Sequence, residues 1–215
     1  MKIRQAKKRD LQKILQNDPA ATSAWVVKRT YTGYKALCAY RYAHKLWLKG
    51  MKSLALYVSF KAKEKTGIDI HPAANIGSGI FIDHGVGLVI GETTEIGDNC
   101  VLYQGVTLGG TGKDTGKRHA TLDEGVMVSA GAKVLGPVHI GAHSKIGAGS
   151  VVLKDVPPYS TVVGVPGRII KIRTCDGCAN KGKEACCLSE KSLSASSEKT
   201  VDIADSSSGA ENQNE

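Results

Sequence analysis

The chain has 215 residues, of which 41% are hydrophobic and only 5% aromatic, and it contains 25 glycines. This length allows one full core with an accessory region, and the glycine content indicates many tight turns rather than long helices. No apolar run is long enough to cross a bilayer, and Met1 opens a basic segment rather than a signal peptide, so we expect a soluble, cytoplasmic protein.

The net charge of +9 is concentrated in the first 65 residues, whereas residues 188–215 are acidic on balance. A basic segment can attract nucleic acid, a membrane or an anionic ligand. Because no aromatic-rich groove or groove-reading motif accompanies it, we favour a solvated helix face, with neither nucleic acid nor membrane as a partner.

Residues 1–66 are predicted to be helical. The apolar residues up to Leu15 fit one face of a short helix that ends at Asn17-Asp18-Pro19. From Ser23 to Lys63 apolar residues recur at three- and four-residue intervals, with Gly33 and Gly50 as candidate breaks. Thr66-Gly67 closes the region.

Residues 67–172 repeat with a period of six, which is typical of a parallel β-helix. Each hexad is expected to form one short strand and a corner, with its aliphatic residue pointing inward, and three hexads complete one coil. Known hexapeptide helices of this kind wind left-handed. The predicted fold is therefore mainly β, a left-handed parallel β-helix with a helical N-terminal region. The inward positions are Ile70, Ile76, Ile82, Leu88, Ile90, Ile96, Leu102, Leu108, Leu122, Val128, Val134, Ile140, Ile146 and Val152, with a slip of two residues at Leu88 and a longer interruption after Leu108.

Residues 173–215 abandon the repeat, and the Ser- and charge-rich part is predicted to be disordered. Four cysteines, at positions 175, 178, 186 and 187, leave zinc binding or redox sensing open. We favour a thiol-bearing tail, because adjacent cysteines are awkward tetrahedral ligands, and we expect no metal. Cys38 and Cys100 are predicted to be small buried core residues.

Two places in the repeat region could perform chemistry. Asp83-His84 lies at the corner after Ile82, and Asp69 falls nearly one coil earlier, so the Asp69 carboxylate could orient the His84 imidazole as a proton acceptor. The alternative is a solvated corner pair, since turns favour Asp. The interruption at 109–119 is Gly-rich and ends in Arg118-His119, which could hold a carboxylate; the alternative is an ordinary loop.

The stretch from Asp69 to Arg168 resembles the serine O-acetyltransferases of the hexapeptide-repeat acyltransferase family. The segments are DIHPAANIGSGIFIDHGVGLVIGETTEIGDN, VTLGGTGK, KRHATLDEGVMVSAGAKVLG and KIGAGSVVLKDVPPYSTVVGVPGRI. The similarity extends upstream to Asp18-Pro19-Ala20 and covers most of the chain up to about residue 172. The repeat is shared by many acyltransferases, whereas the Asp-His corner combined with GGTGK and Arg-His is far more specific.

The resemblance implies acetyl transfer from acetyl-CoA to L-serine, the first step of cysteine biosynthesis from serine. His84 would be the general base, with Asp69 orienting it and His119 assisting in positioning or proton transfer. Arg118 would bind the serine carboxylate, and Asp83 with Asp18 its ammonium group. The attack would be direct, because no positioned Cys or Ser nucleophile is apparent.

The resemblance also implies that acetyl-CoA is a co-substrate and that no cofactor is tightly bound. CoA would lie along the β-helix. It would contact Gly110, Thr111, Ala130, Lys145 and Ala148, with Arg168 near its phosphates. Cysteine is expected as a feedback inhibitor at the serine site.

Active sites of this family lie between subunits, so a homotrimer is the minimum assembly implied. The commoner bacterial form has a longer helical N-terminal region that pairs two trimers; this sequence starts later, so we expect a trimer, with a hexamer as the alternative. Many members end in an isoleucine that enters O-acetylserine (thiol) lyase. This sequence ends Asn212-Gln213-Asn214-Glu215, which leaves that complex open.

Two alternatives to serine acetylation remain at this stage. An O-acetyltransferase for a sugar or xenobiotic hydroxyl would use the same scaffold and a His base, but it has no need of Asp18, Asp83 and Arg118 as a clamp for a zwitterion. A catalytically silent β-helix could act as a binding module, although the presence of both His84 and His119 argues against it.

Overall fold

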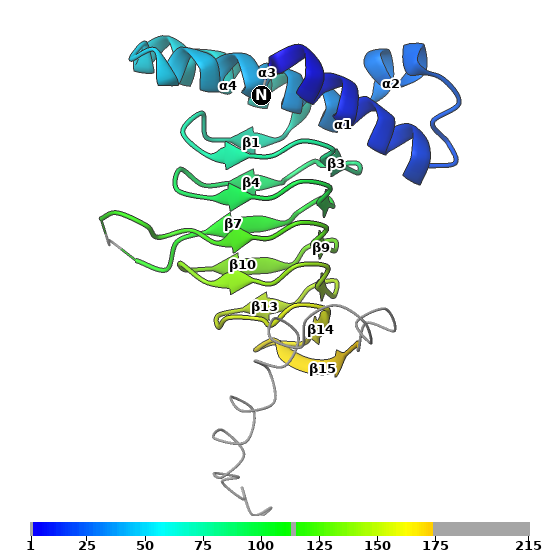
Figure 1. The fold of residues 1–215 in the computed structure, drawn as a ribbon. Helices are drawn as coiled ribbons and strands as arrows, with labels where there is room; N and C mark the ends of the chain where they lie inside the picture. Colours follow the sequence, from blue (N-terminus) through cyan, green and yellow to red (C-terminus); the bar gives the residue numbers. More distant parts are fainter. Residues whose placement is uncertain (1, 113–114, 174–215) are drawn as a thin grey trace, which may run out of the picture. The chain divides into compact units, whose positions relative to one another are not determined.

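The computed structural model describes residues 2–112 and 115–173, so the predictions for the tail cysteines and for disorder lie outside the described residues. Four helices come first and lie across one end of a stack of short strands (Figure 1). They are α1 (Ile3–Asn17), α2 (Ala24–Thr30), α3 (Thr32–Leu48) and α4 (Lys52–Thr66). Within the described ranges, no helix is long and apolar enough to span a bilayer.

The ends of the helices follow local sequence signals. Helix α2 begins after Ser23, whose hydroxyl accepts a 3.3 Å hydrogen bond from the Val26 N–H. Helix α4 ends at Gly67, which adopts the left-handed conformation at φ 69° as predicted for a C-terminal glycine. The predicted break at Gly50 is confirmed, since it separates α3 from α4.

The predicted break at Gly33 is wrong. The chain breaks at Tyr31, which separates α2 from α3, and Gly33 lies in the first turn of α3. It is a glycine for a different reason: a Cβ there would overlap the backbone oxygen and side chain of Ile82. Gly33 therefore lets the start of α3 pack directly on the first coil of the repeat region.

The strands form three sheets, in which each parallel strand pairs with the strand one coil away. Sheet A contains β1 (Asp69–Ile70), β4 (Val89–Ile90), β7 (Thr107–Gly109), β10 (Lys133–Leu135) and β13 (Val151–Val152). Sheet B contains β2 (Asn75–Ile76), β5 (Glu95–Ile96), β8 (Thr121–Leu122) and β11 (His139–Ile140). Sheet C contains β3 (Phe81–Ile82), β6 (Val101–Leu102), β9 (Met127–Val128), β12 (Lys145–Ile146), β14 (Ser160–Val163) and the antiparallel β15 (Arg168–Ile172).

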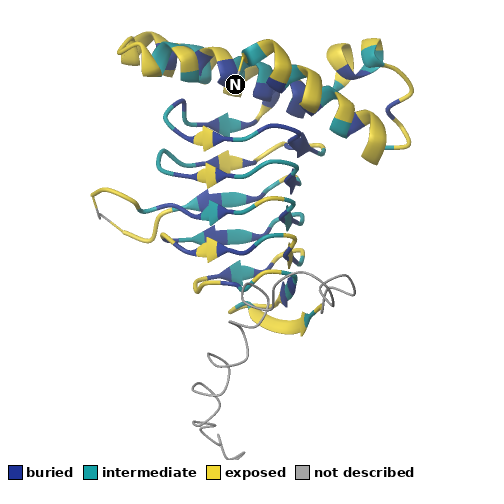
Figure 2. Cartoon of the chain, viewed as in Figure 1, coloured by how far each residue is buried: buried dark blue, intermediate teal, exposed yellow. Residues whose placement is uncertain are grey.

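The predicted inward positions are confirmed, and the fold is the predicted left-handed parallel β-helix. All of the predicted positions are buried (Figure 2), and each stacks on its equivalent in the next coil. In sheet A, for example, Ile90 pairs with Leu108 and Leu108 with Val134. The two-residue slip has a simple cause: Leu88 fills the turn before β4, while Ile90 takes the inward strand position.

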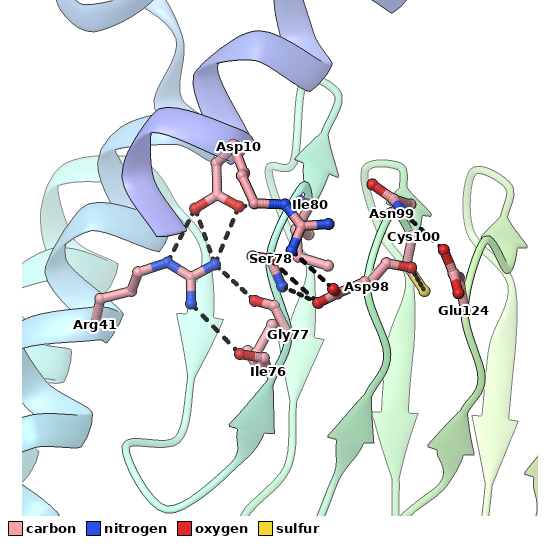
Figure 3. Close-up of polar contacts among 11 residues, drawn as sticks. Asp10, Arg41, Ile76, Gly77, Ser78, Ile80, Asp98, Asn99, Cys100 and Glu124 are labelled. Atoms are coloured by element: carbon pink, nitrogen blue, oxygen red, sulfur yellow. Dashed lines mark hydrogen bonds and ion pairs between the residues drawn. The ribbon is translucent and has the colours of Figure 1, made fainter. Parts of the chain in front are cut away.

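A buried ion pair joins two of the helices to the first coil (Figure 3). Arg41 of α3 donates to both carboxylate oxygens of Asp10 of α1, at 2.9 and 3.0 Å. The same guanidinium donates to the backbone oxygens of Ile76 and Gly77, and Asp10 accepts from the Ile80 N–H. The predicted boundary at 66/67 marks a change of secondary structure within one shared core, since Leu37 packs in the same cluster as Ile70.

Candidate active site

Two acidic residues predicted from the sequence, Asp18 and Asp83, both lie near Tyr31 at one corner of the β-helix. Asp83 and His84 form the turn from β3 in sheet C to β4 in sheet A. Asp18, just after α1, accepts a 2.6 Å hydrogen bond from the Tyr31 hydroxyl, and both Asp18 and Asp83 act on the charge state of Tyr31. We call Asp18, Tyr31, Asp83 and His84 the Asp–His corner.

The backbone of His84 is held in an uncommon conformation. Its φ of 55° lies in the left-handed region, which is unfavourable for a residue with a side chain. The Thr32 hydroxyl, at the start of α3, donates a 2.8 Å hydrogen bond to the His84 backbone oxygen. The imidazole itself is 74% exposed and free to meet a ligand.

The expected pairing of Asp69 with His84 is not formed within this chain. The Asp69 carboxylate lies 2.7 Å from Lys63 Nζ, at the end of α4. Among the described residues, the only carboxylate within ion-pair distance of the His84 ring is Asp83, at 3.7 Å. Because the Asp69 side chain is 40% exposed, its partner depends on side-chain rotation, and its role beside His84 stays a prediction.

Arg118 and His119 lie at a second corner, where the chain turns from sheet A to sheet B. Arg118 Nη2 lies 2.6 Å from Glu92 Oε2, and His119 Nδ1 lies 2.8 Å from Thr93 Oγ1. Glu92 and Thr93 lie in the equivalent turn one coil earlier, and His71 lies in the turn two coils earlier, where it packs edge-on against Trp47. We call His71, Glu92, Thr93, Arg118 and His119 the Arg–His corner.

The two histidines of the Arg–His corner are poor proton acceptors at rest. Burial lowers the pKa of His71, and burial with the Arg118 charge lowers the pKa of His119. His119 is only 8% exposed, whereas His84 is open to solvent. The structure therefore separates one accessible imidazole from two that are held neutral.

The two corners flank sheet A and do not meet in one chain. The Asp–His corner enters sheet A from sheet C, and the Arg–His corner leaves it toward sheet B. No hydrogen bond or ion pair joins them in the described part of the chain. Val89 of β4 is 38% exposed, and Val86, in the same turn as His84, is 62% exposed, so apolar side chains lie at the surface on and beside sheet A.

Two of the residues expected to contact CoA, Ala130 and Ala148, lie along the corner between sheets C and A. Ala130 and Ala148 precede Gly131 and Gly149, which have φ values of 70° and 68° and follow each other one coil apart. Lys145 points outward from β12, and Arg168 is exposed at the start of β15. The Thr111 side chain lies beside Gly136, and Gly110 lies beside the backbone oxygen of Arg118.

A surface pocket in the described ranges, of whose lining only Lys145 is a predicted site residue, lies apart from both corners. It has a volume of about 570 Å³ and lies over sheet C, between Lys13 of α1 and Arg173 after β15. Neither corner contributes a residue to it.

Cys100 is buried as predicted, and burial raises the pKa of its thiol to about 12, which makes it a poor nucleophile. Cys38 is half-buried rather than fully enclosed, because it packs at the edge of the cluster between α1, α2 and β3. Neither thiol belongs to either corner.

Sequence reasoning missed Tyr31, His71, Glu92 and Thr93. His71 and Glu92 lie within the quoted DIHP and GETTEIG segments, so they were visible but had no partner to give them a role. Tyr31 and Thr93 gain importance only from contacts with Asp18 and with Arg118-His119, which the folded chain brings close.

Comparison with known proteins identifies the family. The family model "Bacterial transferase hexapeptide (six repeats)" matches residues 119–154. The serine acetyltransferase of Bacillus pumilus is 53% identical over 163 residues, covering 76% of this chain and 75% of that protein. The chain belongs to the serine acetyltransferase family.

Solved structures of serine acetyltransferases share the fold. That from Vibrio cholerae is 46% identical, with a TM-score of 0.79 over 82% of this chain and 68% of that chain. The Brucella abortus protein in complex with coenzyme A is 44% identical, with a TM-score of 0.77 over 80% and 69% of the two chains. Other similar serine acetyltransferases were solved with cysteine or with serine. The predicted family, fold and enzyme class are confirmed.

Proposed function

We propose that this member of the serine acetyltransferase family transfers the acetyl group of acetyl-CoA to the hydroxyl of L-serine at a site that two subunits complete together. The observation that supports the shared site is the separation of the two corners by sheet A within one chain. In a closed trimer with sheet A toward the threefold axis, the Asp–His corner of one copy meets the Arg–His corner of the next. The apolar Val86 and Val89 would be covered in the same contact.

The carboxylates of the Asp–His corner suit the ammonium group of serine. Asp18 and Asp83 both lie near the Tyr31 hydroxyl, so two negative charges face one small region. Arg118 from the neighbouring copy would bind the serine carboxylate, since a guanidinium matches a carboxylate with two parallel hydrogen bonds. A sugar hydroxyl would use neither set of charges, which favours serine over a sugar or xenobiotic acceptor.

His84 would take the proton from the serine hydroxyl as its oxygen attacks the thioester carbonyl. The tetrahedral adduct would then collapse, with breakage of the carbon–sulfur bond and return of the proton from His84 to the CoA sulfur. Asp69 would orient His84 once its ion pair with Lys63 is broken. No acyl-enzyme is required. Direct transfer agrees with the positions of Cys38 and Cys100 outside both corners.

Acetyl-CoA would lie along the small-residue corner formed by Ala130-Gly131 and Ala148-Gly149, where no side chain blocks an extended pantetheine arm. Gly110 and Thr111 would border its reactive end, and Lys145 and Arg168 would lie near its phosphates. No tightly bound cofactor is needed for this chemistry.

Cysteine, which shares the ammonium and carboxylate of serine, would compete with serine for Asp18, Asp83 and Arg118. The cytoplasmic location and the homotrimer stay predictions, with a hexamer as the alternative, and the thiol lyase complex stays open.

Subunit complementation tests the shared site. His84→Ala and Arg118→Ala are each expected to lose turnover, measured as CoA release with L-serine. Co-expressed in one cell, the two chains should regain part of the activity, because some interfaces then combine an intact His84 with an intact Arg118. Mixed trimers that contain both variants and remain inactive would refute a site shared between these corners.

Parallel acceptor assays test the substrate. L-Serine should support turnover, while L-homoserine and a galactoside should support far less. Turnover on the galactoside alone would agree with the fold and with His84 as the base, but it would refute the binding of a zwitterion by Asp18, Asp83 and Arg118. Absence of turnover on all three would favour the silent binding module.

A further inference from the structure

Thr93 makes five polar contacts with residues 117–119, one of which is the 2.8 Å hydrogen bond that its backbone oxygen accepts from Lys117 Nζ. Its hydroxyl oxygen accepts hydrogen bonds from the backbone N–H groups of Arg118, at 3.0 Å, and His119, at 3.1 Å. The same oxygen lies 2.8 Å from His119 Nδ1. The Thr93 backbone N–H also points at His119 Nδ1, at 3.2 Å.

These contacts determine where the protons lie. A hydroxyl has one hydrogen and two lone pairs, and both lone pairs of Thr93 already accept a hydrogen bond. Its hydrogen must therefore point to His119 Nδ1, which the Thr93 N–H also approaches. A nitrogen that faces two donors has to be an acceptor, so the proton of the neutral His119 ring lies on Nε2.

One face of the His119 ring packs on backbone. A Cβ at position 91 would overlap Cδ2, Nε2 and Cγ of His119, so Gly91 provides the space for the ring. The charged and titratable groups around the ring are those of Arg118, Lys117, Glu92 and His71. Of these only Glu92 favours a protonated ring, and its carboxylate already pairs with Arg118 at 2.6 Å.

We propose that Thr93 is a positioning residue that holds His119 as a neutral ring with its proton on Nε2, so that His119 donates a hydrogen bond to the serine carboxylate and does not take the hydroxyl proton. This assignment rests on the proposed function for the substrate bound at the Arg–His corner. It leaves His84 as the one base of the reaction. It also makes Thr93, not Arg118 alone, a determinant of affinity for the amino-acid substrate.

The tautomer can be measured without any turnover. In the full-length protein labelled with ¹⁵N-histidine, long-range proton–nitrogen correlation separates protonated from unprotonated ring nitrogens, and comparison with His119→Asn assigns the signals. We expect an unprotonated Nδ1 and a protonated Nε2 for His119 at neutral pH. A proton on Nδ1 of the wild-type protein would overturn the proposal, even if serine is acetylated. Absence of serine acetylation would instead refute the proposed function and leave the tautomer result standing.

Kinetics of three variants test the consequence. Thr93→Val should raise KM for L-serine about tenfold, the effect of one lost hydrogen bond, with a smaller change in kcat. Thr93→Ser should restore the wild-type KM, because it keeps the hydroxyl. Thr94→Val is the matched control, since the neighbouring Thr94 hydroxyl is buried without a hydrogen-bond partner among the described residues. Wild-type kinetics in Thr93→Val, or a Thr93→Ser variant as impaired as Thr93→Val, would contradict the role of the hydroxyl.

Discussion

The Tyr31 hydroxyl, at the junction between α2 and α3, donates a 2.6 Å hydrogen bond to Oδ2 of Asp18, which directly follows α1. The other oxygen of Asp18 accepts from the Ala20 N–H at 2.8 Å, so both carboxylate oxygens have a fixed neutral donor. Burial, reinforced by Asp18 and Asp83, raises the pKa of Tyr31 to about 12. Tyr31 therefore stays protonated near neutral pH and orients Asp18 without cancelling its charge.

Replacement of this hydroxyl should weaken binding of the substrate ammonium group. Tyr31→Phe is expected to raise KM for L-serine by about tenfold, the effect of losing one hydrogen bond to a charged group, with KM for acetyl-CoA unchanged. Steady-state kinetics with each substrate varied in turn measure both values. Tyr57→Phe is the control, because Tyr57 is 58% exposed on α4 and belongs to neither corner. An equal rise in both KM values would indicate a general disturbance instead.

The fold was predictable because inward positions depend only on the phase of the six-residue repeat. The slip at Leu88 and Ile90 is readable in the sequence, and both residues are buried. The corners were less predictable. Asp18 meets Tyr31 because helices α1 to α3 dock on the first coil, and Thr93 meets His119 across the whole 109–119 loop. No local spacing encodes such contacts, and the exposed Asp69 shows how a surface side chain can take a different partner from the expected one.

The backbone of His84 offers a test of positioning within the Asp–His corner. Thr32→Ala removes the 2.8 Å hydrogen bond to the His84 oxygen, which supports a left-handed φ of 55°. We expect kcat to fall several-fold while the free energy of unfolding falls by only about 1 kcal/mol. Thr30→Ala is the matched control, because it loses a 2.8 Å hydrogen bond to Val26 inside α2 without touching His84. Equal kcat values in the two variants would argue against this role for Thr32.

The Asp10–Arg41 pair should be a major determinant of stability. Asp10 is 1% and Arg41 7% exposed, so removal of either partner leaves a buried charge unpaired. Arg41→Met and Asp10→Leu are each expected to lower the free energy of unfolding by about 3 kcal/mol in urea denaturation. The double variant should lose less than the sum of the two, since it leaves no unpaired charge. Strict additivity would mean that the two side chains stabilise the junction independently.

Stability should also fall in mildly acidic solution because of two histidines. The pKa values of His71 and His119 are lowered in the folded protein, chiefly by burial, so the unfolded chain binds more protons below the ordinary histidine value of about 6.5. The stabilisation is complete above that pH and is lost as the pH falls through it. Urea midpoints measured from about pH 8 to about pH 5.5 should therefore decrease.

Comparison with variants isolates the contribution of these two rings. His71→Asn and His119→Asn keep an acceptor near the Nδ1 position, which accepts from Ala73 in one case and faces Thr93 in the other. Each should flatten the pH dependence of the unfolding free energy relative to the wild type. Burial raises the pKa of Asp10, which acts in the opposite direction but equally in all three proteins. The pKa of Asp98 is lowered, and its contribution is lost only at more acidic pH. An unchanged slope in both variants would place the acid sensitivity elsewhere in the chain.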